Sequence, residues 1–92
     1  MKTLLVVSAG VEAVAGIKLA QSMGLHVVVS DMNPSAPGFT AADDHIIAST
    51  YDLESTVSAA RIYHNDVRPI DGVICIASDV PLTVASVAAD LG

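Results

Sequence analysis

The chain has 92 residues, of which 52% are hydrophobic, and its ten acidic and four basic residues give a net charge of −6. A chain of this length forms one domain at most. The high apolar content predicts that some apolar surface contacts another domain or another subunit, which could be a second copy of the chain. The negative charge opposes binding to phosphate backbones and anionic lipids. We therefore expect neither nucleic acid nor a membrane as a partner.

The single cysteine, Cys75, lies inside an apolar run. One cysteine allows no disulfide within the chain, which favours a reducing compartment. The apolar stretch near the N-terminus is too short for a signal peptide or a membrane-spanning helix. These features predict a cytoplasmic location.

An apolar run at residues 3–7 breaks at Ser8-Ala9-Gly10, and a helical pattern then covers residues 11–23. Gly24 has the place of a left-handed glycine that ends this helix. A second apolar run, at residues 26–30, predicts a strand covered on both faces of a parallel sheet, with the helix as the crossover.

An acid, Asp31, closes this second run twenty-one positions after Gly10. A glycine after the first strand and an acid at the tip of the second are typical of a mononucleotide-binding βαβ unit. The pattern therefore predicts a small polar ligand.

The second half of the chain continues the alternation of predicted strands and helices. Residues 32–40 hold two prolines and a glycine, which predict a surface loop without a regular element. A short strand follows at residues 45–48, and Asp52 is placed to cap a helix that ends near residue 65. The last elements are a buried strand at residues 72–77 and a helix from Pro81 to the end of the chain.

This order, β-α-β-β-α-β-α, predicts an α/β fold that is Rossmann-like, with three αβα layers. Right-handed crossovers give a mostly parallel four-stranded sheet of probable order 3-2-1-4. Strands one and four are then neighbours whose connections leave in opposite directions, so a crevice opens at their carboxyl ends. Residues 8–12 and 77–81 would line it.

Several side chains in this crevice have two interpretations. Gly10 could give the turn its permissive dihedral angles and leave N–H groups for an anion or carboxylate, or simply make a tight turn. Glu12 could favour the helix dipole or face an amine. Ser78 and Asp79 could cap the last helix and still contact a ligand. Asp31 could bind a ribose, although a role as loop anchor is favoured.

Other site types have little support. The three histidines, His26, His45 and His64, have no partners at metal-ligand spacing, so we expect no metal site. Cys75 is interpreted as a small buried hydrophobe, because a nucleophilic cysteine needs an electropositive, open setting. The turn has one glycine where dinucleotide enzymes have three, which disfavours NAD. No catalytic residue is predicted.

With these motifs in place, the chain resembles the N-terminal, pre-ATP-grasp domain of ATP-grasp ligases, especially proteins like the large subunit of carbamoyl phosphate synthetase. The resemblance covers nearly all of residues 1–92. The motifs that carry it are Ser8-Ala9-Gly10, the run from Asp31 to Pro37, Ala42-Asp43-Asp44-His45, and Asp71-Gly72-Val73-Ile74 leading to Ser78-Asp79.

The resemblance implies a ligase that uses ATP and Mg²⁺ to convert a carboxylate to an acyl phosphate, which an amine or similar nucleophile then attacks. This domain would hold the carboxylate or amine substrate and be inactive alone, with ATP and Mg²⁺ bound by a downstream domain or a partner subunit. By position, the residues implied to bind substrate are Gly10, Val11, Glu12, Ser78 and Asp79.

Two other readings stay open. The chain could be a stand-alone binding module for a small ligand, or one subunit of a split enzyme that pairs through its excess apolar surface. It could also be an NAD(P)-binding domain, which predicts that these residues alone bind a dinucleotide.

Overall fold

A computed structural model describes residues 1–11, 13–49, 52–75 and 81–91 of the chain. In that part, four strands alternate with four helices. In chain order the elements are β1 Thr3–Val7, α1 Ala13–Ser22, β2 His26–Asp31, α2 Pro37–Ala41, β3 Asp44–Ile47, α3 Leu53–Asp66, β4 Gly72–Ile74 and α4 Pro81–Leu91.

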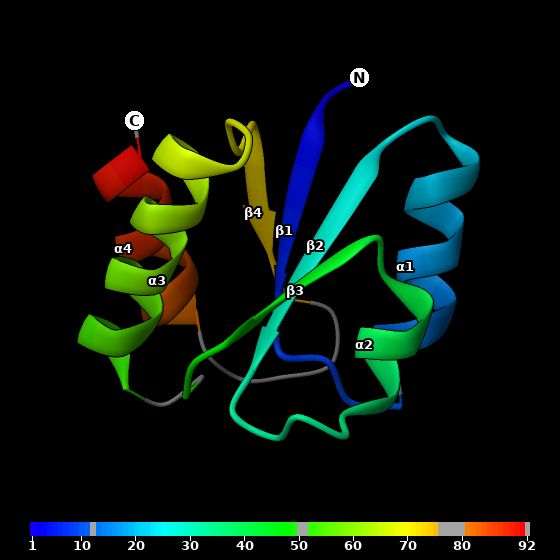
Figure 1. The fold of residues 1–92 in the computed structure, drawn as a ribbon, viewed down its shortest axis with the longest axis horizontal. Coiled ribbons are helices and arrows are strands. Elements are labelled where there is room, and N and C mark those ends of the chain that lie inside the picture. The colour runs from blue at the N-terminus through cyan, green and yellow to red at the C-terminus, as the bar shows by residue number, and fades with distance from the viewer. Residues whose placement is uncertain (12, 50–51, 76–80, 92) are drawn as a thin grey trace.

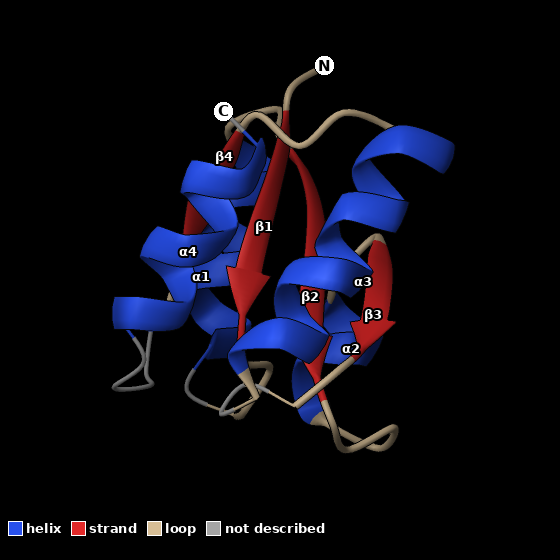
Figure 2. Ribbon diagram, turned by 90° about the vertical axis from the view of Figure 1, so that its left-hand side faces the viewer, coloured by secondary structure: helices blue, strands red, loops and turns tan. Residues whose placement is uncertain are grey.

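The four strands form one parallel sheet of order β3-β2-β1-β4, so the predicted fold class and strand order are confirmed. Helices α1 and α2 cover one face of the sheet and α3 and α4 the other (Figure 1). Figure 2, turned by 90°, shows the strands running in one direction between these layers. The carboxyl ends of the strands therefore share one edge of the sheet.

The core follows from the alternation of side chains along β1 and β2. Val27 and Val29 pack with Ile17 on the α1/α2 face, whereas Val28 packs with Leu5 on the α3/α4 face. All five side chains have 0% exposure. Strands buried on both faces read as continuous apolar runs, which explains why the sequence pattern located them.

The expectation of a loop without a regular element over residues 32–40 is wrong, because α2 begins at Pro37. Proline lacks an N–H, and this costs nothing at the first position of a helix, where that group has no partner within the helix. Gly38 lets this short helix approach the β1 turn. Pro37 and Gly38, two of the three residues that predicted a loop, are therefore what allow the helix at this place.

The first helix, α1, buries mainly small residues against the sheet. Its buried residues are Ala13, Ile17 and Ala20, whereas the larger apolar residues Leu19 and Met23 of the predicted helical segment are 63% and 71% exposed. Small alanines let α1 lie close to the sheet, and the larger side chains remain outside.

Two predicted helix boundaries are confirmed. Gly24 follows α1 with a φ of +86°, and the Asp52 side chain caps α3 by accepting a hydrogen bond from the Ser55 N–H. Strand β4 is shorter than predicted: it ends at Ile74, and Cys75 beyond it is half-buried against the core. Residues 76 and 77 lie outside the described part of the chain.

None of the described helices is long and apolar enough to cross a membrane. Within the same residues, no group of three or more histidine, cysteine, aspartate or glutamate side chains is arranged to hold a metal ion.

Candidate functional site

The turn that follows β1 depends on Ser8 rather than on Gly10. Ser8 has a φ of +80°, in the left-handed region that favours glycine, whereas Gly10 has no positive φ. The Ser8 N–H donates to the Ser30 carbonyl at 2.7 Å, which extends the pairing of β1 with β2 by one residue. The prediction that Gly10 supplies the permissive dihedral angles is therefore wrong.

A clamp from the β2–α2 segment fixes the next residue, Ala9. Its N–H donates to Asp31 Oδ2 at 3.0 Å, and its carbonyl accepts from the Gly38 N–H at 2.8 Å. Asp31 Oδ1 accepts from the Asn33 N–H at 3.1 Å, so both carboxylate oxygens serve the fold. The interpretation of Asp31 as a loop anchor is confirmed.

Beyond the clamp, Gly10 and Val11 are the last described residues before α1. The amide N–H groups of Gly10 and Val11 have no acceptor among the described residues, although their carbonyls accept from Ala13 and Val14 at the start of α1. Val11 is 67% exposed, so this segment is open to solvent. Amides at the start of a helix favour an anionic oxygen, because the helix dipole is positive there.

The structure thus places Gly10 and Val11 together at the carboxyl end of β1. Glu12, Ser78 and Asp79, the other predicted substrate-binding residues, lie outside the described residues. The described part of this turn offers N–H donors and the Ser8 hydroxyl. An oxyanion suits this set better than an ammonium group, which requires acceptors.

Ser30, beside this turn on β2, has an unusual side chain. It is 1% exposed, and its hydroxyl has no hydrogen-bond partner among the described residues. Because side chains alternate along β2 and Val28 faces α3 and α4, Ser30 faces the same layer. A buried hydroxyl without a partner costs about 1–3 kcal/mol.

The opposite, amino-terminal edge of the sheet is hydrogen-bonded at each turn. Asp71 Oδ2 accepts from the Thr3 N–H at 2.8 Å, and Asp43 Oδ2 accepts from the Val27 N–H at 2.9 Å. The hydrogen bond from Val27 lowers the pKa of Asp43 below its ordinary value. His64 Nδ1 accepts from the Ile70 N–H at 2.9 Å. Side chains therefore tie down the segments that enter β1, β2 and β4.

Tyr63 of α3 completes this edge. Its hydroxyl donates to Asp44 Oδ2 at 2.9 Å and lies 3.4 Å from His26 Nε2. Burial and the hydrogen bond to Asp44 raise the pKa of Tyr63 to about 12. The three histidines have different neighbours. His26 lies near Tyr63, His45 stacks on Phe39, and His64 accepts the hydrogen bond from the Ile70 N–H.

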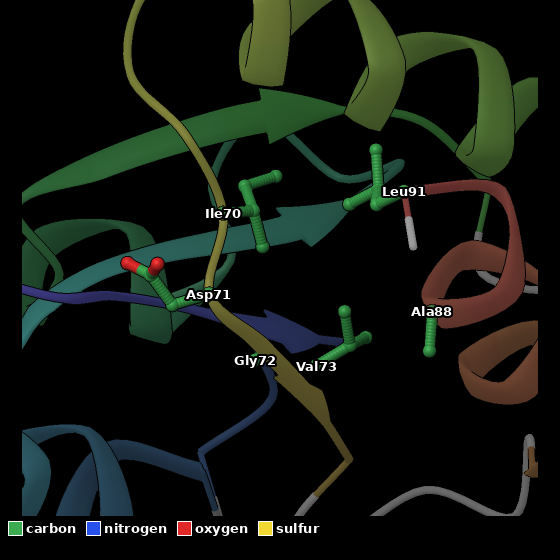
Figure 3. Close-up of a pocket in the computed structure, with 6 residues that line it drawn as sticks. All are labelled: Ile70, Asp71, Gly72, Val73, Ala88 and Leu91. Atoms are coloured by element: carbon green, nitrogen blue, oxygen red, sulfur yellow. The ribbon is translucent and has the colours of Figure 1, made fainter.

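Two hollows lie on this side of the molecule. The first, of about 370 Å³, is between β4 and α4, where Ile70, Val73, Ala88 and Leu91 gather while the Asp71 carboxylate points away (Figure 3). The second, of about 470 Å³, includes Lys2 and Arg68. Of the predicted substrate-binding residues that the structure describes, neither Gly10 nor Val11 lines either hollow.

No family model matches the sequence, and no curated protein does. Several solved structures share the fold. Phosphoribosylglycinamide synthetase from Anaerococcus prevotii matches with a TM-score of 0.80 and 22% identity over 96% of this chain. Glycinamide-RNase-transformylase T from Mycobacterium tuberculosis matches with a TM-score of 0.77 and 17% identity over 96% of this chain. N5-carboxyaminoimidazole ribonucleotide synthetase from Thermotoga maritima matches with a TM-score of 0.66 and 24% identity over 82% of this chain.

The chain covers only 22%, 25% and 19% of the lengths of these three proteins, respectively. At such identities the likeness establishes the fold. The chain is thus a Rossmann-like α/β unit with the architecture of about a fifth to a quarter of each of these larger proteins.

Proposed function

We propose that the chain is the substrate-side domain of an ATP-grasp ligase, and that it holds the substrate at the carboxyl edge of β1 while ATP and Mg²⁺ bind elsewhere. The observation that carries the proposal is the pair of amides at Gly10 and Val11 that have no acceptor in the described part of the chain, next to a turn clamped by Asp31 and Gly38. The fold shared with three larger proteins, two of them synthetases, supports it.

The donor set favours one end of the substrate. Neutral N–H groups can hold a carboxylate or phosphate oxygen, whereas an amine would need an acceptor. Two of the similar proteins are named for phosphoribosyl or ribonucleotide compounds, which carry a phosphate. We therefore propose an anionic oxygen of the substrate as the group bound by this turn.

The alternative of an NAD(P)-binding domain is weakened by Asp31. An acid at this position would have to accept hydrogen bonds from a ribose, yet its two oxygens already accept from the Ala9 and Asn33 amides. The narrower likeness to carbamoyl phosphate synthetase stays a prediction, because the solved structures above carry other names.

The partner proposed for this domain is a downstream ATP-grasp domain or a separate subunit. Large apolar side chains are exposed on several elements, including Leu19 on α1, Ile62 on α3 and Ile47 on β3, at 63%, 61% and 58%. Such surface supports a covering partner, and a homodimer would use it equally well. A stand-alone binding module would have to leave it in water.

The test is a calorimetric titration of the 92-residue chain with three probes: ribose 5-phosphate as the oxyanion, glycinamide as the amine, and MgATP. The proposal expects saturable binding of ribose 5-phosphate alone. Binding of glycinamide alone would reverse the assignment of the substrate group. Saturable binding of MgATP would contradict the proposal that ATP and Mg²⁺ bind elsewhere. Absence of binding by all three probes would reject a substrate site in this domain.

A matched pair of variants tests the position of the site. Gly10→Ala adds one methyl group beside the amides that have no described acceptor, without a backbone penalty, because Gly10 has no positive φ. Gly72→Ala adds the same group at the opposite edge, where a Cβ would lie 3.5 Å from Leu4 Cδ1, an ordinary contact. We expect only Gly10→Ala to weaken binding of ribose 5-phosphate, and equal effects would remove the site from the β1 turn.

A further inference from the structure

We draw no further inference here: the strongest candidate, the hollow between β4 and α4 that is lined by Ile70, Val73, Ala88 and Leu91 at the β4 edge of the sheet, is an apolar surface without a partner among the described residues, and nothing in the structure shows what covers it.

Discussion

The two edges of the parallel sheet differ in how completely their polar groups are used. At the amino-terminal edge, Asp43 and Asp71 each accept a hydrogen bond from a backbone N–H at the start of a strand, and the Tyr63 hydroxyl donates one to Asp44. At the carboxyl edge, two amides and the Ser30 hydroxyl have no partner among the described residues. The comparison suggests that one edge stabilises the fold and that the other keeps bonding capacity for a ligand.

Asp31 makes the contrast sharper. It lies at the carboxyl edge and both its carboxylate oxygens accept hydrogen bonds, which fix the loop around Ala9, while the Gly10 and Val11 amides have no acceptor among the residues that the structure describes. A preorganised loop with unused donors binds a ligand with little loss of conformational freedom. Within the described residues, the carboxyl edge is therefore hydrogen-bonded where it supports the turn and has unpartnered donors where the proposed substrate would lie.

The largest expected effect comes from the clamp. Gly38→Ala forces a Cβ to 2.8 Å from the Ala9 backbone oxygen, which cannot move without breaking its hydrogen bond. We expect the free energy of unfolding to fall by about 2 kcal/mol, measured by urea denaturation. Gly72→Ala at the other edge is the control, and equal losses would show that the β1 turn is no more tightly packed than β4.

The next effect tests the amino-terminal edge. Asp43→Ala removes the acceptor of the Val27 N–H and should cost about 1–2 kcal/mol at pH 7. Since the pKa of Asp43 is lowered in the folded chain, its contribution is present above the unfolded pKa of about 4 and is lost as pH falls through the folded value. The two proteins should converge in stability in acid, and a constant difference across pH would contradict this role.

A smaller effect is expected from Tyr63→Phe, about 1 kcal/mol at neutral pH, because the hydrogen bond to Asp44 is lost. The folded pKa of about 12 lies above the ordinary value of 10. The contribution of Tyr63 is therefore full below pH 10 and is lost as pH rises toward 12. Unfolding followed from pH 8 to 12 should show a steeper alkaline loss in the unmodified chain, and parallel curves would disprove the assignment.

The smallest effect has the opposite sign. Ser30→Ala removes a buried hydroxyl that has no described partner, so we expect the free energy of unfolding to rise by about 0.5–1 kcal/mol. Thr56→Val is the control, because the Thr56 hydroxyl donates to the Ser49 carbonyl at 2.6 Å and its loss should destabilise. A loss of stability in Ser30→Ala would mean that the hydroxyl has a partner in solution.

Much of the fold could be predicted because its strands are buried on both faces. The continuous apolar runs at β1 and β2, the cap at Asp52 and the glycine after α1 each have a local cause that is visible in the sequence. The helix α2 could not be predicted in the same way. It depends on Gly38 lying against Ala9, a contact between segments 29 residues apart in sequence.

The predicted strand order placed Gly10 and Val11 at the carboxyl edge of the sheet, where the structure has them, whereas the binding of a ligand there stays a proposal. The motif directed attention to Gly10, whereas the residue with the unusual φ is Ser8, which the pattern gave no reason to prefer. The unpartnered state of Ser30 depends on its three-dimensional surroundings, which no single-sequence pattern describes. The available signal was a serine at the end of two adjacent apolar runs, directly after β1 and at the second-last position of β2.

The central claim is that ligand binding belongs to the carboxyl edge. The most direct test is an amide map of the ¹⁵N-labelled chain by NMR during titration with ribose 5-phosphate. The account predicts shifts that are largest at Gly10 and Val11 and extend through Ser8 to Gly38. Shifts centred instead on Lys2, Arg68 and Asp71, which line the hollow at the amino-terminal edge, would contradict it.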